Sequence, residues 1–246
     1  MERLVKTRGA IAIIPARGGS KRLPKKNILD FFGRPMIAWT IQAALESECF
    51  DRVLVSTDAP QIAKVAKQWG AEVPFLRQTA ADDYTPVSEA TITALNQARA
   101  HWQEDYETVV QLMPNCPLRA AKDIQMALAA FAASAANFQI SCFRFGWMNP
   151  WWSVTLTDDG QPQPQFPEAQ MQRSQDLPPL YCPTGAIWMA HAISLLQAAS
   201  FYGPGHQFHP MSWTSAVDID DAEDLEFARA VYLLNNPLTA PAMTNS

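Results

Sequence analysis

The chain has 246 residues, of which 48% are hydrophobic and 17% charged, and its formal net charge is −5. This length and composition fit one large α/β domain, with or without an inserted lobe. Because there is no overall excess of positive charge, extended binding to nucleic acid through phosphate neutralisation is not expected.

Neither the start of the chain nor its cysteines indicate export, a membrane span or a metal-thiolate site. The first apolar run is short and ends at Pro15, so we expect no signal peptide, no membrane partner and, by default, a cytoplasmic location. The four cysteines are far apart and form no CxxC pair, which argues against a zinc site and a disulfide framework.

The first half of the chain alternates strand and helix patterns. Residues 10–14 form an apolar run between Gly9 and Pro15, as expected for a strand buried on both faces of a parallel sheet. The alternation continues with expected helices at 35–45, 60–69 and 122–135 and expected strands at 53–55 and 108–113. The sequence therefore predicts an α/β fold with a doubly wound, mostly parallel sheet.

Residues 146–183 interrupt this pattern. They contain three tryptophans and seven prolines without a sustained period, so we expect a lobe or excursion that leaves the sheet. An apolar run at 185–190 and a closing helix at 222–234 follow. We therefore expect a single domain over residues 1–236 and a disordered tail at 237–246.

The loop after the first strand gathers positive charge. It reads PARGGSKRLPKKN at 15–27 and follows a buried strand, which places it at the carboxyl edge of the sheet, where open α/β folds bind ligands. Its two glycines let backbone N–H groups approach an anion, and its basic side chains, Arg17, Lys21 and Lys26, offer charge-assisted hydrogen bonds to phosphate oxygens. The loop has neither the GxxxxGK pattern of a Walker A motif nor the GxGxxG spacing of a dinucleotide site. Each basic residue alone could be a solvated surface charge, but the set in this place predicts a triphosphate site.

Two aspartates precede the closing helix. Asp218 and Asp220 are two positions apart, so on an extended strand their carboxylates would project from the same face and could share one hard cation such as Mg²⁺. The alternative is that the acidic residues between 218 and 224 open the helix, since acids are frequent in the first helical turn. From the residues alone the helix start is the commoner explanation, and both remain open.

Several sequence blocks together resemble one known family. The stretch IAIIPARGGSKRLPKKN is followed in order by GRPMIAWTIQAAL, FDRVLVSTD, GAEVPFLR, PNCPLR and VDIDDAEDL. These blocks resemble the acylneuraminate cytidylyltransferases, the CMP-sialic acid synthetase family, from about residue 11 to residue 230. The most specific part is the A-R-x-x-S-K-x-x-x-x-K-N pattern at 16–27. The resemblance implies a Rossmann-like nucleotidyltransferase fold, with 146–183 as an inserted lobe used in dimerisation.

The resemblance also implies where the nucleotide and the metal bind. It places the nucleotide on the first loop, at Ala16, Arg17, Ser20, Lys21, Lys26 and Asn27. Arg17 and Lys21 are expected to act in catalysis with Asp218, because negative charge developing on the leaving pyrophosphate must be neutralised. Metal-binding aspartates fall at Asp218 and Asp220, so for these two residues the resemblance favours an Mg²⁺ cofactor over the helix start.

Further contacts are implied away from the first loop. Arg77 and Ser88 are expected near the nucleotide, although a capping or solvent-exposed hydroxyl is the alternative for Ser88. Asn115 and Arg173 are expected at the sugar, where a planar guanidinium can grip a carboxylate with two hydrogen bonds. The alternative for Arg173 is a surface arginine on a loop.

The chain departs from the family pattern on the sugar side. Met113 stands where many members have a glutamine, and Trp152 and Cys182 stand where members have a lysine and an arginine. A less polar acceptor pocket is therefore expected. Trp147, Trp151 and Trp152 could stack on a sugar face, but burial in a dimer-forming lobe is slightly favoured.

The expected function is transfer of CMP from CTP to the anomeric hydroxyl of a sialic-acid-like nonulosonic acid, with release of pyrophosphate. The enzyme is expected to act as a homodimer, with no nucleic acid partner. One alternative is CTP-dependent activation of an eight-carbon 3-deoxy keto-acid sugar. Another is a noncatalytic nucleotide-binding domain that kept the fold without the chemistry.

Overall fold

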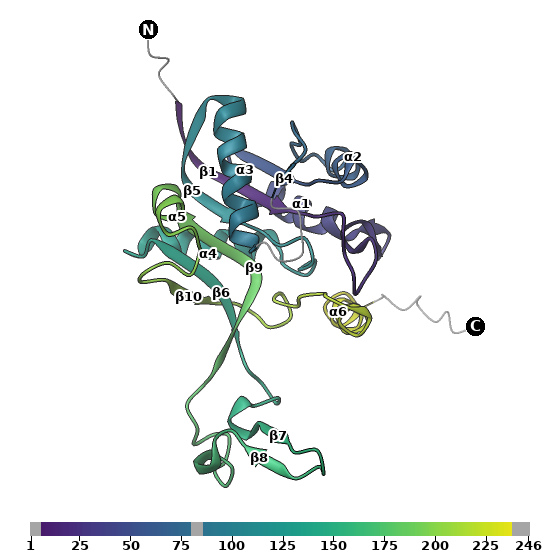
Figure 1. The fold of residues 1–246 in the computed structure, drawn as a ribbon, viewed down its shortest axis with the longest axis vertical. Helices are drawn as coiled ribbons and strands as arrows, with labels where there is room; N and C mark the ends of the chain where they lie inside the picture. Colours follow the sequence, from purple (N-terminus) through teal and green to yellow (C-terminus); the bar gives the residue numbers. More distant parts are fainter. Residues whose placement is uncertain (1–5, 80–85, 238–246) are drawn as a thin grey trace, which may run out of the picture.

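A six-stranded sheet forms the centre of the molecule, in a computed structural model that describes residues 6–79 and 86–237 (Figure 1). Its order is β10-β6-β9-β5-β1-β4, with β1 at Lys6–Pro15, β4 at Arg52–Ser56, β5 at Glu104–Gln111, β6 at Phe138–Arg144, β9 at Tyr181–His191 and β10 at Gln207–Pro210. β1 runs parallel to β4 and β5, and β10 runs parallel to β6, whereas β9 is antiparallel to both of its neighbours. The expected mostly parallel sheet is confirmed.

Helices cover both faces of this sheet. They are α1 (Met36–Glu46), α2 (Pro60–Gln68), α3 (Val87–Trp102), α4 (Ala121–Ala133), α5 (Ala192–Ala198) and α6 (Ala222–Asn235). Ile11 and Ile13 of β1 pack in one core cluster with residues of α3 and α5. Ala12 and Ile14 pack in the other with residues of α1, α2 and α4. Because successive side chains of a strand point to opposite faces, β1 is buried on both, as the apolar run predicted.

A third, smaller core cluster places the closing helix beside the first loop. Leu225, Ala228 and Val231 of α6 pack with Phe31, Met36, Val217 and Ile219. Phe31 belongs to the short strand β2 (Asp30–Phe31), which pairs with β3 (Arg34–Pro35) just before α1. This cluster brings residues 217–220 next to the segment that follows β1, although about 190 positions separate them.

Local signals in the sequence explain where several helices start and stop. Pro60 is the first residue of α2, where a missing N–H is tolerated, and Gly70 follows its end with φ +92°. Asp221 caps α6 by accepting hydrogen bonds from the backbone N–H groups of Glu223 and Asp224. The helix-start explanation is therefore confirmed for Asp221, Glu223 and Asp224.

The sequence missed several elements. The helices expected at 35–45, 60–69, 122–135 and 222–234 and the strands at 10–14, 53–55, 108–113 and 185–190 all occur, with ends shifted by a few residues. The patterns did not predict α3, β6, α5 or β10. Of the tail expected at 237–246, residues 238–246 lie outside the described residues.

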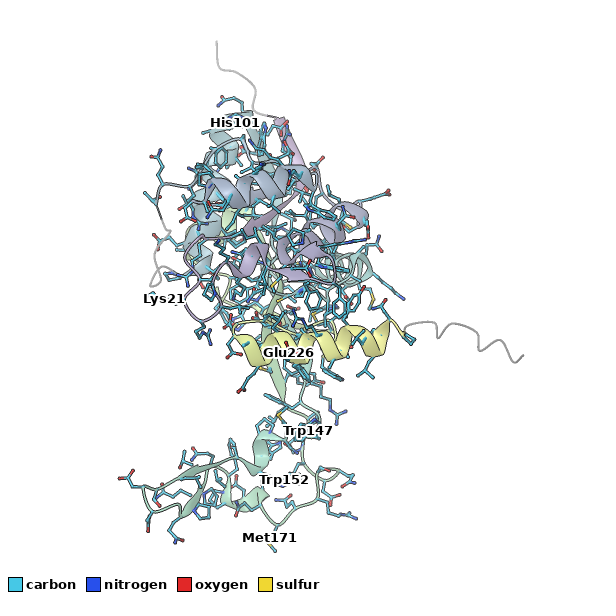
Figure 2. All side chains as sticks on the ribbon, turned by 90° about the vertical axis from the view of Figure 1, so that its right-hand side faces the viewer. Lys21, His101, Trp147, Trp152, Met171 and Glu226 are labelled. Atoms are coloured by element: carbon cyan, nitrogen blue, oxygen red, sulfur yellow. The ribbon has the colours of Figure 1, made fainter. Side chains whose placement is uncertain are left out.

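The segment between β6 and β9 leaves the sheet as a separate lobe (Figures 1 and 2). β6 and β9 continue to pair as far as Arg144 opposite Tyr181, so the lobe itself spans residues 145–180. It contains a hairpin of β7 (Val154–Leu156) and β8 (Pro162–Pro164) and the short 3-10 helices η2 (Pro150–Trp152) and η3 (Pro167–Ala169). Within residues 6–79 and 86–237, no helix combines the length and the apolar character needed to cross a bilayer.

Candidate active site

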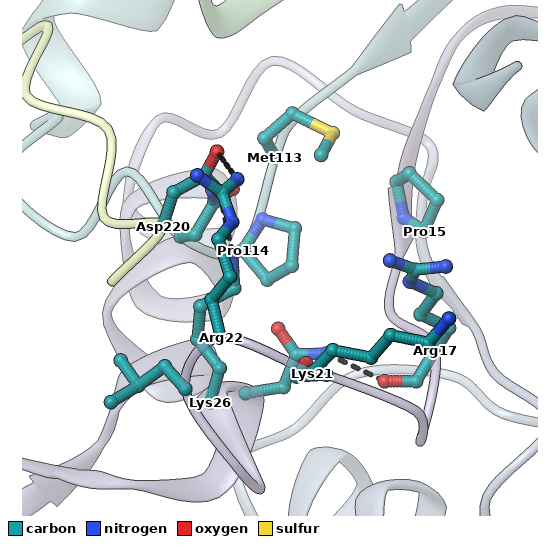
Figure 3. A pocket seen from close by; sticks show the side chains of 12 residues that line it. Pro15, Arg17, Lys21, Arg22, Lys26, Met113, Pro114 and Asp220 are labelled. Atoms are coloured by element: carbon teal, nitrogen blue, oxygen red, sulfur yellow. Dashed lines mark hydrogen bonds and ion pairs between the residues drawn. The ribbon is translucent and has the colours of Figure 1, made fainter. Parts of the chain in front are cut away.

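A cleft of about 470 Å³ opens where the loop after β1 faces the segment before α6 (Figure 3). The sequence-predicted residues Arg17, Ser20, Lys21, Lys26, Asn27, Asn115 and Asp220 all line it, together with Pro15, Arg22, Leu23, Met113 and Pro114. The carboxyl ends of β1 and β5 lead directly into its walls, at Pro15 and Met113. The cleft therefore lies at the sheet edge where α/β folds bind ligands.

Hydrogen bonds hold the first loop in shape. The Ala16 N–H donates to the carbonyl of Ser56 at 2.9 Å, and the Gly18 N–H donates to Oδ1 of Asp58 at 2.8 Å. Across the loop, the buried Asn27 side chain donates to the carbonyl of Arg17 at 2.9 Å. Asn27 thus fixes the loop from within, and η1 (Lys26–Ile28) ends it.

Four cations of this loop line the cleft, and two of them reach the acidic wall. Nζ of Lys26 lies 2.8 Å from Oδ1 of Asp220, and Arg22 pairs with the other carboxylate oxygen. Burial disfavours the charged form of Asp220, but the hydrogen bonds from Lys26 and Arg22 outweigh this effect and lower its pKa. Figure 3 shows Arg17 and Lys21 on the side of the cleft away from Asp220. An anion in the cleft would meet these cations.

Asp218 lies beside Asp220 in a different environment. Its carboxylate accepts a hydrogen bond from Nδ2 of Asn115, which also lies 3.2 Å from Oδ1 of Asp220. The residue keeps an exposed surface, but the protein packed around its carboxylate, together with the negative charge of Asp220, raises the pKa of Asp218 to about 6. The two carboxylates are therefore close enough to share a cation, and one of them is protonated readily.

The expected strand geometry for this acidic pair is wrong. Residues 217–220 belong to no strand of the described chain. Their sides still alternate, because Val217 and Ile219 are buried against α6 while Asp218 and Asp220 are not. Asp220 lines the cleft, whereas the predicted site residue Asp218 does not line it and lies beside Asp220 on Asn115. The Ile219 N–H donates to the carbonyl of Asn115 at 2.9 Å, so a turn after β5, not a sheet, holds the segment.

Arg77 and Ser88 do not line the cleft described above. Arg77 is buried behind the first loop, with 4% of its surface exposed. Its Nη1 lies 3.3 Å from the hydroxyl of Ser56, and its Nε has no partner among the described residues. Burial lowers its pKa, Asp58 opposes that effect and Arg17 adds to it, so Arg77 lies within electrostatic range of Arg17. Ser88 is a buried residue of the first turn of α3 and not part of a loop.

The structure does not bring Arg173 to the cleft of its own chain. Arg173 lies in the lobe with its side chain 79% exposed, and it pairs with Asp176 three positions later. The paired strands β6 and β9 carry the whole lobe away from the body, as Figure 2 shows for Trp147, Trp152 and Met171.

The three tryptophans of the lobe do not line the cleft either. Trp151 packs edge to face on Phe166 and donates from Nε1 to the carbonyl of Pro178 at 2.9 Å, so it belongs to the core of the lobe. Trp147 and Trp152 are exposed. None of the three is therefore placed to stack on a ligand in the cleft of its own chain.

Sequence patterns missed several residues that shape the site. Arg22 was part of the basic loop and Asp58 ended the FDRVLVSTD block, but neither was singled out as a site residue. Gly185 of β9 lies so close that a Cβ there would be 3.0 Å from Cγ of Met113 and 3.5 Å from Oδ2 of Asp218. The only sequence signal at Gly185 is that the apolar run at 185–190 begins there, directly after the proline-rich lobe.

The chain is similar in sequence to known proteins over most of its length. A sequence model described as Cytidylyltransferase matches residues 11–145. The chain is 32% identical over 228 residues to a pseudaminic acid cytidylyltransferase of Campylobacter jejuni, with 92% of this chain and 97% of that protein covered. It is 33% identical over 230 residues to a CMP-N,N'-diacetyllegionaminic acid synthase of Legionella pneumophila, with the same two coverages, 92% and 97%.

Solved structures show a matching fold. The chain is similar to a CMP:2-keto-3-deoxy-manno-octonic acid synthetase complexed with CTP, with a TM-score of 0.68 and 19% identity, over 93% of this chain and 100% of that one. At this identity the likeness concerns the fold alone.

Proposed function

The chain belongs to the cytidylyltransferase family, and we propose that it transfers CMP from CTP to the anomeric hydroxyl of a sialic-acid-like nonulosonic acid, with release of pyrophosphate. The observation that carries this proposal is the cleft in which the basic loop after β1 faces Asp220, with Asp218 held beside Asp220 by Asn115. Both relatives described above are named for activating nonulosonic acids, which supports this acceptor class.

The proposed reaction is one displacement at phosphorus. The anomeric hydroxyl oxygen bonds to the α-phosphorus of CTP and loses its proton to solvent water. The bond from that phosphorus to the bridging oxygen breaks, and pyrophosphate carries away the electron pair. Little covalent chemistry is required of the protein, so positioning and charge neutralisation provide most of the rate. Arg17 and Lys21 would neutralise the departing pyrophosphate, and Lys26 would hold a phosphate oxygen while it fixes Asp220.

We include Mg²⁺ in the proposal, and the donor atoms fit it. Mg²⁺ is usually held by one or two carboxylates together with substrate phosphates, and Asp218 and Asp220 supply two carboxylates beside each other on Asn115, of which Asp220 lines the cleft. The buried Oδ1 of Asn115, which lacks a hydrogen-bond partner in the described chain, adds a third oxygen beside them. When bound, Mg²⁺ would neutralise phosphate charge and increase the acidity of the attacking hydroxyl. Within residues 6–79 and 86–237, no cluster of three or more acidic, histidine or cysteine side chains could hold a metal alone, so the phosphates would complete the site.

We also propose that the lobe joins two copies of the chain. It exposes a group of large apolar side chains, Trp147, Met148, Leu156 and Met171, of which Met171 is 95% exposed. A second chain packed on the lobe would remove these side chains from water, which favours association. In a homodimer Arg173 could serve the cleft of the partner chain. Light scattering should then give twice the chain mass, and replacing Trp147 and Leu156 by serine should return a monomer. A monomeric parent chain would contradict this part.

The central experiment measures pyrophosphate release with CTP, Mg²⁺ and a panel of keto-acid sugars. We expect release only when all three components are present and the sugar is a nonulosonic acid, for which sialic, legionaminic and pseudaminic acids are tested. Turnover with an eight-carbon 3-deoxy keto acid alone would instead make the chain an octulosonic-acid enzyme. Binding of CTP without turnover of any sugar would indicate a noncatalytic domain.

Arg17→Ala provides the matched test of the cleft. We expect turnover to fall by about 10²- to 10³-fold, because the charge that neutralises the departing pyrophosphate is lost. The thermal midpoint should change little, because Arg17 lies on a loop. Arg229→Ala, which breaks an exposed pair with Glu226 on α6, is the control and should keep full turnover. A large loss of stability in Arg17→Ala would show that the residue is structural.

A further inference from the structure

Arg119 is the bulkiest side chain that is almost fully withdrawn from solvent, at 2% exposure. Nη1 donates to the carbonyl of Ala186 at 2.5 Å and lies 3.4 Å from the carbonyl of Met113. Nε and Nη2 have no hydrogen-bond partner, and no carboxylate pairs with the group, as far as the described residues show. Burial lowers the pKa of Arg119 to about 10, although Cys116 and Asp123 act in the opposite direction, so the group is still charged at neutral pH. A buried charge with no carboxylate in direct contact contributes little to the stability of a fold, which suggests another role.

The two carbonyls that Arg119 contacts belong to two walls of the cleft. Met113 begins the turn after β5, residues 113–116, which we call the Met113 turn. Ala186 lies in β9, next to Gly185. Because a Cβ on Gly185 would be 3.0 Å from Met113 and 3.5 Å from Asp218, the strand, the turn and the acidic segment touch at this point with little free space.

The Met113 turn also holds the acidic pair, Asp218 and Asp220. Asn115 accepts the Ile219 N–H at 2.9 Å through its carbonyl and donates to the Ile219 carbonyl at 3.1 Å through its side chain. The same side-chain nitrogen contacts Asp218 and Asp220. A displacement of the turn would therefore move both carboxylates.

We propose that Arg119 is a positioning residue that clamps the Met113 turn to β9 and so sets where Asn115 holds Asp218 and Asp220. Arg119 does not line the cleft, so its effect on the reaction is transmitted through the turn. The effect of Arg119 on turnover rests on the proposed function, whereas its effect on the position of the acidic segment does not. The two consequences are measured separately.

Hydrogen exchange tests the clamp without any substrate. Arg119→Met replaces the guanidinium by an apolar side chain of similar length, which proteins often tolerate without loss of stability. We expect the Ile219 amide to exchange at least about tenfold faster in Arg119→Met, since its acceptor on the turn is released, while the amides of β1 keep their protection. Arg52→Met is the control. Arg52 pairs with Glu72 and Glu104 at the opposite end of the sheet, so its loss should lower the thermal midpoint without faster exchange at Ile219.

Kinetics then test the consequence for the reaction. Arg119→Met should lower kcat by about 100-fold, the scale expected for an error of about 1 Å in positioning, with KM for CTP within about threefold of the parent. Arg119→Lys keeps the charge but not the forked geometry, and we expect kcat about tenfold below the parent. Unchanged exchange at Ile219 in a folded Arg119→Met protein, or kcat within about threefold of the parent, would overturn the inference.

If Arg119→Met does not fold, the clamp is tested on Arg119→Lys by hydrogen exchange at Ile219 and by kcat. Faster exchange at Ile219 together with reduced kcat would support the clamp, and parent values for both would overturn it. If the parent chain turns over none of the sugars, the proposed function fails, and hydrogen exchange still decides whether Arg119 positions the acidic segment.

Discussion

Nζ of Lys26 lies 2.8 Å from Oδ1 of Asp220, although 194 positions separate the two residues. The contact joins the basic loop after β1 to the acidic segment before α6 and closes one end of the cleft (Figure 3). The Lys26 side chain is only 15% exposed, whereas that of Asp220 is 42% exposed. The lysine is thus shielded on the protein side, while the carboxylate remains accessible from the cleft.

Replacing Lys26 by methionine should weaken CTP binding more than it weakens the fold. A phosphate oxygen would lose a charge-assisted hydrogen bond, so we expect KM for CTP to rise by about tenfold or more. The free energy of unfolding should change by about 1 kcal/mol or less, because the pair is partly exposed. Initial rates at varied CTP and urea denaturation measure the two effects. Lys122→Met, on the surface of α4, is the control, and equal KM values for the two variants would contradict this role.

The pKa of Asp218 predicts how Mg²⁺ dependence changes with pH. Below about pH 6 the carboxyl is mostly protonated, so the Mg²⁺ concentration for half-maximal turnover should rise as the pH falls through 6. Asp220, whose pKa is lowered, contributes no such change in this range. Rates at pH 5.5, 6.5 and 7.5 over a series of Mg²⁺ concentrations provide the measurement. A half-saturation value that is constant between these pH values would show that Asp218 is not a ligand.

The same pKa has a consequence for stability without metal. Because the folded-state pKa of Asp218, about 6, is above the ordinary value of 3.8, folding disfavours its ionised form. The stability of the parent chain relative to Asp218→Asn should therefore fall as the pH rises from about 4 to above 6. At pH 7.5 in EDTA we expect the asparagine variant to be at least as stable in urea. A less stable variant would mean that the carboxylate is needed by the fold.

Two adjacent glycines of the first loop should differ in their tolerance of alanine. A Cβ on Gly18 would lie 2.9 Å from Cβ of Ala59, too close for either backbone to stay in place, whereas a Cβ on Gly19 meets nothing within 4 Å. Gly18→Ala should therefore cost about 1 to 3 kcal/mol of unfolding free energy. Gly19→Ala should change it by less than about 0.5 kcal/mol. Urea denaturation of both variants checks this, and similar losses would show that the loop packs differently on α2.

Local patterns in the sequence predicted the part of the fold that places the phosphate loop. The apolar run between Gly9 and Pro15 marked β1, and Pro60 and Gly70 marked the ends of α2, because each depends on signals within a few residues. In contrast, α3 begins with β-branched residues, Val87, Thr91 and Ile92, whose strand preference obscures the helical period.

The parts of the site that depend on distant contacts could not be predicted in this way. Asp220 lines the cleft and Asp218 lies beside it, but a turn containing Asn115, about 100 positions away, holds them. Arg119 ends the PNCPLR block, but nothing in that block predicts its burial, since arginines are seldom fully buried. The position of Arg173 depends on how far β6 and β9 extend beyond the sheet, which no local pattern encodes.

Met113 presents a thioether to the cleft across from Lys21 (Figure 3). The Met113 carbonyl accepts a hydrogen bond from Thr40 at 3.3 Å, and Gly185, which has no Cβ, allows Met113 to pack closely against β9. These two contacts fix the position of Met113 in the wall of the cleft. A thioether is a weak acceptor and donates no hydrogen bond, so a sugar hydroxyl buried against it would lose about 1 to 3 kcal/mol, whereas a methyl group would be favoured. We therefore expect the parent enzyme to prefer nonulosonic acids that end in a methyl group over those with a hydroxylated tail.

Met113→Gln should shift this preference toward the hydroxylated sugars. One new hydrogen bond of about 1 to 1.5 kcal/mol would change the ratio of kcat/KM values for N-acetylneuraminic acid and a 9-deoxy nonulosonic acid by about tenfold. Met113→Leu, which stays apolar, is the control and should keep the parent ratio. Both side chains are similar in size to methionine, so a change in ratio would report the chemistry of this wall and not a loss of packing. An identical ratio in the glutamine and leucine variants would mean that the acceptor sugar does not touch Met113, and that another wall of the cleft selects it.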